Sequence, residues 1–178
     1  MNTFDLQPMT EKHFPAVLLL NKEWEHVTSP LDEESLLALW NQAAYRKIAV
    51  AEDAVVAFLI ALREGQSYAS PNYQWFEKHF QNFGEKPSSG AFLYIDRIVV
   101  SGAHQGSGIA QEFYQDIIAD AREQGLEQVV CEIDFEPPNL RSSKFHDRFG
   151  FKEIGRQWVC DGKKQVSLRS KRVSGMSS

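Results

Sequence analysis

A glycine-rich turn after an apolar run is the part of this sequence best suited to chemistry. From Ile98 to Ala110 it reads Ile-Val-Val-Ser-Gly-Ala-His-Gln-Gly-Ser-Gly-Ile-Ala. Glycines let the backbone approach an anion closely, and the N–H groups at the start of a following helix add a positive field. The turn therefore predicts a site for a phosphate or a pyrophosphate.

Two familiar phosphate motifs do not fit this turn. A dinucleotide fingerprint beginning at Gly106 requires glycine or alanine at position 111, where the sequence has Gln111. A phosphate loop of the nucleoside-triphosphatase type requires Gly-Lys-Ser/Thr, which is absent. The anion site must therefore belong to another class of protein.

The elements around the turn predict a mixed α/β chain. Apolar alternation and helical periodicity place strands and helices in the order β-α-α-β-β-β-α-β-α-β-β. The expected strands are Thr3–Met9, Lys47–Glu52, Val55–Arg63, Phe92–Val100, Gln128–Phe135, Phe151–Val159 and Lys164–Ser170, and the expected helices are Glu11–Asn21, Asp32–Ala43, Gly108–Gln124 and Leu140–Phe149. The connection between Glu64 and Gly90 carries six aromatic residues, too many for a disordered linker, so it forms a packed cover or a pocket wall.

Two motifs at the right separation resemble those of the GCN5-related N-acetyltransferase (GNAT) superfamily. Gln105-x-x-Gly108-x-Ala110 is similar to its pyrophosphate motif, Q/R-x-x-G-x-G/A, five residues after Val100. The stretch from Asn139 to Phe151 resembles its second signature, N-x-x-A/S-x-x-x-Y-x-x-x-G-F. The element order is similar as well, over residues 3 to 173.

The resemblance implies a fold and a set of acetyl-CoA contacts. The fold would be a mixed sheet of about six or seven strands, splayed between the fourth and fifth and flanked by about four helices. It would form a single domain over 1–173, with a flexible tail at 174–178. In such proteins the pantetheine of acetyl-CoA pairs with the splayed strand as an added strand would. By similarity, the contacts come from Ile98, Val99, Val100, Gln105, Gly106, Ser107, Gly108, Ile109, Ala110, Gln111, Asn139 and Ser142.

The implied reaction transfers an acetyl group from the thioester to an amine. The amine must lose a proton, the oxyanion needs an N–H donor such as that of Val99 or Val100, and the leaving thiolate needs a proton. Asp96 is the first candidate base, because it stands in an apolar strand and Arg97 is expected to point to the other face. Asp134, five residues before Asn139, is the second, and a purely structural role for Asp96 stays open.

The sequence departs from the superfamily at the proton donor. The tyrosine that commonly follows the asparagine by seven residues is replaced by His146. A histidine can donate as imidazolium or through a water molecule. Loss of the tyrosine is also compatible with a chain that binds acyl-CoA as a sensor or interaction module without catalysis.

The resemblance places the amine acceptor between the first two helices and the loop before the central strand. Those regions supply Trp24, Glu25, Tyr73 and Trp75, and acidic groups beside aromatic faces suit a cationic amine. The alternative is that the aromatic residues simply build a core. A small-molecule or peptide amine is the expected acceptor, and its identity is left open.

Composition excludes several other classes. A net charge of -5 and no basic stripe disfavour nucleic-acid binding. No apolar run is long enough for a membrane span, and no signal peptide is recognisable, so a cytoplasmic protein without membrane contact is expected.

Cys131 and Cys160 are expected to be reduced core thiols, and neither lies on the two motifs, which disfavours a covalent thiol intermediate. No metal site is expected. A homodimer is compatible with the resemblance.

Overall fold

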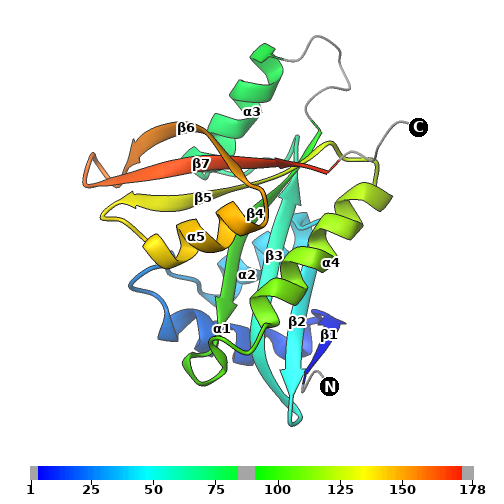
Figure 1. Cartoon of the computed structure of the whole chain (residues 1–178). Helices are drawn as coiled ribbons and strands as arrows, with labels where there is room; N and C mark the ends of the chain where they lie inside the picture. The colour runs from blue at the N-terminus through cyan, green and yellow to red at the C-terminus, as the bar shows by residue number, and fades with distance from the viewer. Residues whose placement is uncertain (1–3, 84–90, 174–178) are drawn as a thin grey trace. The chain divides into compact units, whose positions relative to one another are not determined.

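The computed structural model describes residues 4–83 and 91–173 and contains a seven-stranded sheet in the order β1-β2-β3-β4-β5-β7-β6 (Figure 1). Strands β4 and β5 are parallel, whereas β1–β2, β2–β3, β5–β7 and β6–β7 are antiparallel, so the sheet is mixed as expected. The strands are β1 (Asp5–Pro8), β2 (Tyr45–Ala51), β3 (Ala54–Arg63), β4 (Phe92–Val100), β5 (Gln128–Glu136), β6 (Lys152–Val159) and β7 (Lys164–Arg172).

The described residues form five α-helices rather than about four. They are α1 (Phe14–Glu23), α2 (Glu33–Gln42), α3 (Pro71–Phe83), α4 (Ile109–Glu123) and α5 (Leu140–Arg148), with single turns of 3-10 helix at η1 (Glu11–His13) and η2 (Gly102–His104). The additional helix is α3, in a region that the sequence predicts to be a connection.

The chain divides into two compact units. The first comprises Met1–Leu62 and Ile95–Ile117, and the second comprises Arg63–Tyr94 and Ile118–Ser178. Strand β4 and helix α4 each contribute residues to both units. The expectation of one domain over 1–173 stays a prediction, and the tail 174–178 lies outside the described residues.

In the first unit, β3 lies between β2 and β4, and it is apolar on both faces. Its residues from Val56 to Leu62 are all buried, as expected for an inner strand. Asp32 caps α2, its Oδ1 accepting a hydrogen bond from the Ser35 N–H at 2.8 Å. Phe14 of α1 meets Trp40 of α2 edge to face, with ring centroids 6.0 Å apart. These contacts fix α1 and α2 within this unit.

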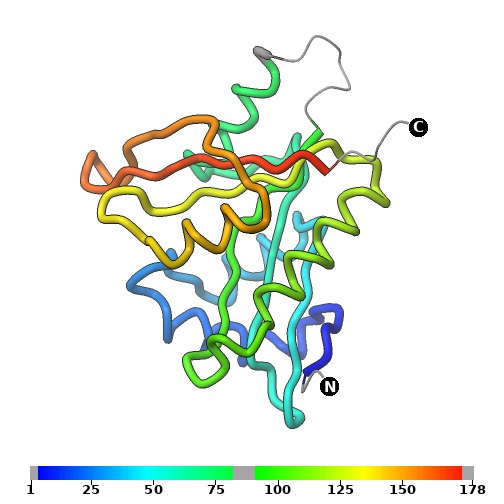
Figure 2. Tube along the Cα trace, in the orientation of Figure 1, coloured from blue at the N-terminus to red at the C-terminus, as the bar shows by residue number. Residues whose placement is uncertain are grey.

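In the second unit, β6 and β7 form a hairpin that follows α5 along the chain (Figure 2). The parallel ladder of β4 and β5 joins Phe92, Leu93 and Tyr94 to Gln128, Val129 and Val130. This pairing occupies the N-terminal third of both strands, and the remainder of β4 belongs to the first unit.

The prediction that residues 66–83 form an irregular connection is wrong, because α3 occupies most of them. Ser70 begins the helix, its carbonyl accepting from Gln74 N–H at 3.0 Å. Tyr73, Phe76 and Phe80 fall on one helical face, and their rings lie 5.5–6.2 Å from those of Phe92 or Tyr94. The spacing of Tyr73, Phe76 and Phe80 at i, i+3 and i+7 is a helical signal that the sequence analysis missed. One face of the segment is therefore a packed cover, and several of its other residues line a cavity.

The two cysteines have different environments. Cys131 is buried in β5, and burial raises the pKa of its thiol. Cys160 is exposed in the β6–β7 turn, where its φ is +53°, so the expectation that both thiols lie in the core is wrong for Cys160. Among the described helices, none has the length and apolar character needed to cross a membrane.

Candidate functional site

The glycine turn of the first unit has the backbone that an anion site requires. Gly106 and Gly108 have φ values of +82° and +90°, which residues with a Cβ rarely adopt. A Cβ built on either glycine would meet nothing within 4 Å, so both face open space. Helix α4 starts directly after Gly108, whose carbonyl accepts from Glu112 N–H at 3.0 Å. The N–H groups of its first turn have no acceptor within the helix and can bind an anion.

The same turn is fixed to its surroundings at its N-terminal side. Ser101 N–H donates to the Val56 carbonyl of β3 at 2.9 Å. Gly102 N–H donates to Glu23 Oε1, at the end of α1, at 2.8 Å. A Cβ on Gly102 would lie 2.9 Å from that oxygen, so this position favours glycine because of close approach. The turn is therefore held by both β3 and α1.

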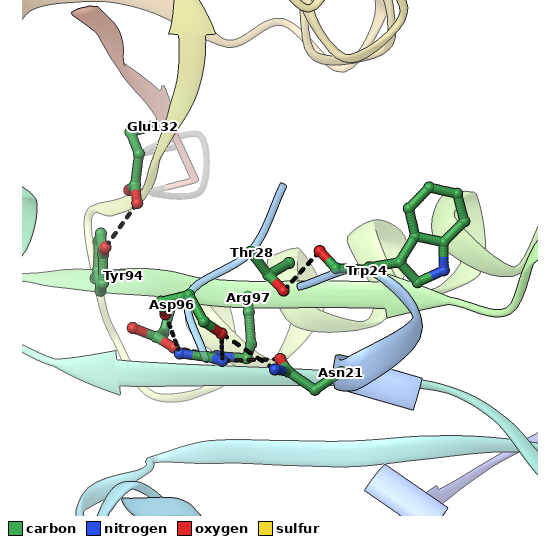
Figure 3. Close-up of polar contacts among 8 residues, drawn as sticks. Asn21, Trp24, Thr28, Tyr94, Asp96, Arg97 and Glu132 are labelled. Atoms are coloured by element: carbon green, nitrogen blue, oxygen red, sulfur yellow. Dashed lines mark hydrogen bonds and ion pairs between the residues drawn. The ribbon is translucent and has the colours of Figure 1, made fainter. Parts of the chain in front are cut away.

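On β4, Asp96 forms a buried ion pair with the adjacent Arg97 (Figure 3). Arg97 Nε donates to Asp96 Oδ2 at 2.7 Å, and the two side chains are 7% and 5% exposed. Arg97 alternates with Asp96 along the strand as expected, but its long side chain brings the guanidinium back to the carboxylate, a pairing that the sequence analysis did not predict. Asp96 is thus the counter-charge of a buried guanidinium.

The residues after Asp96 keep the alternation of a strand. Ile98 and Val100 are partly exposed, as is Asp96 when its backbone is included, whereas Arg97 and Val99 are buried. The predicted pantetheine contacts are backbone groups of Ile98 to Val100, so this segment supplies donors and acceptors beside the turn.

In the second unit, Asn139 caps α5. Its Oδ1 accepts from Ser142 N–H at 3.0 Å, and its own N–H donates to the Asp134 carbonyl at 3.1 Å. The cap uses only the side-chain oxygen of Asn139, and the side-chain NH2 group takes no part in it. Asn139 is exposed and Ser142 partly exposed, so both predicted cofactor residues are accessible on α5.

His146 is buried in α5 and lies among aromatic rings. Its Nδ1 is 2.7 Å from the Ser142 carbonyl, which can only accept, so Nδ1 carries the proton. The rings of Phe145 and Phe151 lie 5.5 and 5.3 Å from the imidazole. Burial lowers the His146 pKa to about 4, against a smaller opposing effect of the hydrogen bond. The imidazole is therefore neutral at pH 7.

Arg169 of β7 attaches α5 to the sheet of the second unit. Its Nη2 donates to Ser143 Oγ at 2.8 Å, and its Nη1 to Asp147 Oδ1 at 2.5 Å. Its Nε donates to Ser167 Oγ at 3.2 Å. A buried guanidinium thus binds two side chains of α5 and fixes the helix that carries Asn139 and Ser142.

Strand β5 presents two carboxylates on one face. Asp134 Oδ1 is 2.7 Å from Lys164 Nζ, and its side chain is 24% exposed. Glu132, two residues earlier, accepts from the Tyr94 hydroxyl at 3.0 Å (Figure 3). Sequence reasoning missed Tyr94 and Glu132. The alternation of Glu132 with Asp134 is the signal that could have indicated Glu132.

The predicted acceptor residues fall into two groups. Trp24 and Glu25 follow α1 in the first unit, where Glu25 is exposed and the buried Trp24 Nε1 has no hydrogen-bond acceptor in the described chain. Tyr73 is 1% exposed and its hydroxyl donates to the Arg63 carbonyl at 2.7 Å, so its ring belongs to the core of the second unit, at the wall of a cavity. Trp75 stacks on His79 with centroids 4.6 Å apart.

No group of three or more metal-binding side chains occurs within the described ranges. Comparison with family models gives a match over residues 14–151, described as the acetyltransferase (GNAT) family. The chain belongs to the GNAT family of acetyltransferases. It is therefore an acetyl-CoA-dependent acyltransferase, and acetyl-CoA is its co-substrate. The open glycine turn and the N–H groups at the start of α4 fit the pyrophosphate of that molecule.

Solved acetyltransferase structures share this fold at low sequence identity. The ribosomal-protein-S18-alanine N-acetyltransferase from Escherichia coli has a TM-score of 0.71 and 13% identity, with 98% of each chain covered. Arabidopsis thaliana Naa50, in complex with the bisubstrate analogue CoA-Ac-MVNAL, has a TM-score of 0.69 and 14% identity, covering 95% of this chain and 98% of that one. Arabidopsis thaliana NAA60, in complex with acetyl-CoA, has a TM-score of 0.73 and 12% identity, covering 96% and 99%. Comparison with curated protein sequences finds no match.

Proposed function

We propose that this acetyltransferase transfers an acetyl group directly to the primary amine of a peptide or small molecule. The observation that carries the proposal is the glycine turn of a GNAT family chain, with two positive-φ glycines immediately before α4. Direct transfer is supported by Cys131, whose thiol is buried and has a raised pKa, so little nucleophilic thiolate forms.

We propose that acetyl-CoA is held by the residues that the family motifs indicate. The N–H groups from Gly106 to Gln111 and the side chain of Gln105 would bind the pyrophosphate. Backbone groups of Ile98, Val99 and Val100 would bind pantetheine as a partly unpaired strand does. Asn139 and Ser142 would complete the contacts. When bound, acetyl-CoA supplies the thioester, and an N–H of Val99 or Val100 would stabilise the oxyanion.

For the base, the contacts support Asp134 over Asp96. The Asp96 side chain is 5% exposed and pairs with a buried guanidinium. Asp134 is 24% exposed and pairs with a flexible lysine. A base must receive a proton from the amine and return it to solvent, which a partly exposed carboxylate can do with less disruption.

For His146, the environment supports a positioning role on α5. With a pKa of about 4, roughly one imidazole in a thousand is protonated at pH 7, so it would rarely be able to give a proton to a thiolate. Its Nδ1–H instead holds the Ser142 carbonyl. In this proposal the thiolate takes its proton from water or is released as the anion.

For the acceptor, two structural relatives support the amine of a peptide N-terminus. One is named for the alanine of ribosomal protein S18, and the other is bound to an analogue that contains a peptide. Exposed Glu25 would attract the positively charged amine before it loses its proton. A small-molecule amine is the second acceptor class to test.

Thiol release from acetyl-CoA, measured over alkylamines, polyamines, amino acids and peptides, tests the proposal. We expect turnover with at least one amine, a loss of at least tenfold in kcat in Asp134→Asn, and an unchanged rate in the control Asp161→Asn, a carboxylate of the β6–β7 turn. CoA binding without turnover on any amine would instead support a sensor.

The roles of Asp96 and His146 are separated by the same assay. If Asp96→Asn lowers kcat at saturating amine at least tenfold and Asp134→Asn does not, while the chain remains folded and binds CoA, Asp96 and not Asp134 is the base. If His146→Ala lowers kcat and removes a titrating group from the pH profile without changing the KM for acetyl-CoA, His146 donates a proton after all.

A further inference from the structure

The segment that joins α1 to α2, residues 24–32, is held in place mainly by polar contacts. None of its nine residues is buried, so it has little apolar packing of its own. Its ends are fixed by Glu23, which accepts from Gly102 N–H, and by Asp32, which caps α2. Its middle needs a separate anchor.

That anchor is a buried network centred on Arg97 (Figure 3). Arg97 Nη2 donates to Ser29 Oγ at 2.8 Å, and Nη1 donates to the Ser29 carbonyl at 3.2 Å. Nη1 also donates to Asn21 Oδ1 at 2.8 Å, and Asn21 Nδ2 donates to the same Ser29 carbonyl at 3.1 Å. Asp96 neutralises the guanidinium from the other side. Only a planar group with several fixed donors can reach all of these acceptors.

The segment held in this way carries features suited to contact with a ligand. Val27 is an aliphatic side chain that is 48% exposed. Glu25 is exposed on the same segment. An apolar surface and a carboxylate are what a peptide amine, with its ammonium group, would use.

We propose that Arg97 is a positioning residue for the acceptor, acting through Ser29 to fix the segment 24–32. This inference rests on the proposed function. It also gives Asp96 a reason to stand in β4: the carboxylate holds Arg97 and does not take part in proton transfer. Arg97 touches no substrate, and its effect appears in acceptor binding and not in acetyl-CoA binding.

The test compares Ser29→Ala and Arg97→Lys with Tyr45→Phe. Ser29→Ala removes the hydroxyl that binds Arg97 and leaves the ion pair intact, so it is not expected to unfold the chain. Tyr45→Phe is the matched control, because it removes a hydroxyl bonded to a charged partner, Asp116, at 2.6 Å elsewhere in the first unit.

We expect Ser29→Ala to raise the KM for the best amine about three- to tenfold, and Arg97→Lys to raise it more, with the KM for acetyl-CoA within about twofold of wild type. Tyr45→Phe should leave both KM values unchanged. An unchanged acceptor KM in both Ser29→Ala and Arg97→Lys, with an active wild-type enzyme, would overturn the positioning role and leave the proposed function standing.

Hydrogen exchange gives a second readout that does not need turnover. We expect the hydrogen-bonded amides of Trp24, Val27 and Thr28 to exchange faster in Ser29→Ala and Arg97→Lys than in Tyr45→Phe. If the wild-type chain acetylates no amine, the proposed function fails and the assignment to an acceptor fails with it. Unchanged exchange in both variants would show that Arg97 does not hold the segment at all.

Discussion

Two buried guanidiniums, Arg97 of β4 and Arg169 of β7, have similar structural roles. Each pairs with an aspartate, but the two aspartates differ greatly in exposure to water. Arg97 attaches a strand of the first unit to α1 and the segment after it. Arg169 attaches a strand of the second unit to α5. The partner of Arg97, Asp96, is 5% exposed, whereas the partner of Arg169, Asp147, is 62% exposed.

This difference in exposure shows that burial of the arginine alone does not determine how much an ion pair contributes to stability. In the Asp96–Arg97 pair neither charge is well hydrated, so each depends on the other. In the Asp147–Arg169 pair water still solvates the carboxylate, and the arginine side chain is also satisfied by the Ser143 and Ser167 hydroxyls. We therefore expect the first pair to be intolerant of single changes and the second to be more tolerant.

The largest expected effect is that of Arg97→Met. It leaves Asp96 as a buried charge without its partner, and we expect a loss of about 3–5 kcal/mol in the free energy of unfolding. The double variant Asp96→Asn/Arg97→Met should recover part of this loss, because it removes the uncompensated charge. Urea denaturation followed by circular dichroism measures both. A loss below about 1 kcal/mol for the single variant would contradict the enclosed-pair interpretation.

The next effect is the pH dependence that His146 adds to the second unit. Its pKa is about 4 in the folded chain and 6.5 in the unfolded chain. Between these values only the unfolded chain takes up the proton, so stability falls as the pH drops from 6.5 towards 4. The difference between the two pKa values corresponds to about 3 kcal/mol in the free energy of unfolding. His146→Phe should lose this part of the pH dependence, as measured by urea midpoints from pH 7.5 to 4. Identical pH profiles for variant and wild type would contradict the buried, neutral imidazole.

A smaller effect is expected for Arg169→Met. Asp147 remains hydrated, so the loss comes mainly from the hydrogen bonds to the serine hydroxyls and is about 1–2 kcal/mol. Because α5 carries Asn139 and Ser142, the KM for acetyl-CoA should rise while the KM for the amine changes little. This is the reverse of the pattern expected for Ser29→Ala. Equal stability losses in Arg97→Met and Arg169→Met would contradict the expectation that the pair with the hydrated carboxylate is more tolerant.

The smallest effect is expected for Lys164→Met. Its ion pair with Asp134 has side chains 29% and 24% exposed, and water screens both charges. We expect a stability change below about 1 kcal/mol, which differential scanning calorimetry can measure. A loss as large as that of Arg97→Met would show that partial exposure does not weaken an ion pair in this protein.

Most of the fold could be predicted from the sequence, because the pattern of each element is local. The apolar run of β3, the aspartate cap of α2 and the glycine at the start of α4 all mark their elements without help from distant residues. Helix α3 was missed, although Tyr73, Phe76 and Phe80 recur at the spacing typical of a helix. The tertiary structure adds what that face packs against, the rings of Phe92 and Tyr94.

Some features of the candidate site could likewise be predicted from the sequence, and others could not. The cofactor residues are predicted from spacing, since a glycine turn and a helix cap are short-range features. The surroundings of Asp96 and His146 could not be predicted, because each depends on contacts that the sequence does not display. Arg97 returns to Asp96 and also reaches Asn21 and Ser29, about 70 residues away along the chain. His146 differs from an exposed histidine only through the aromatic rings around it.

The amino-acid sequence by itself determined the order of the elements apart from α3, the glycine turn and the family, because backbone conformation and side-chain periodicity are set by neighbours along the chain. Only the tertiary structure decided which charged groups are enclosed, which are hydrated and which side chains they hold. The physical reason is that the free energy of a charge depends on the dielectric and the partners around it, and folding assembles both from residues far apart in the sequence.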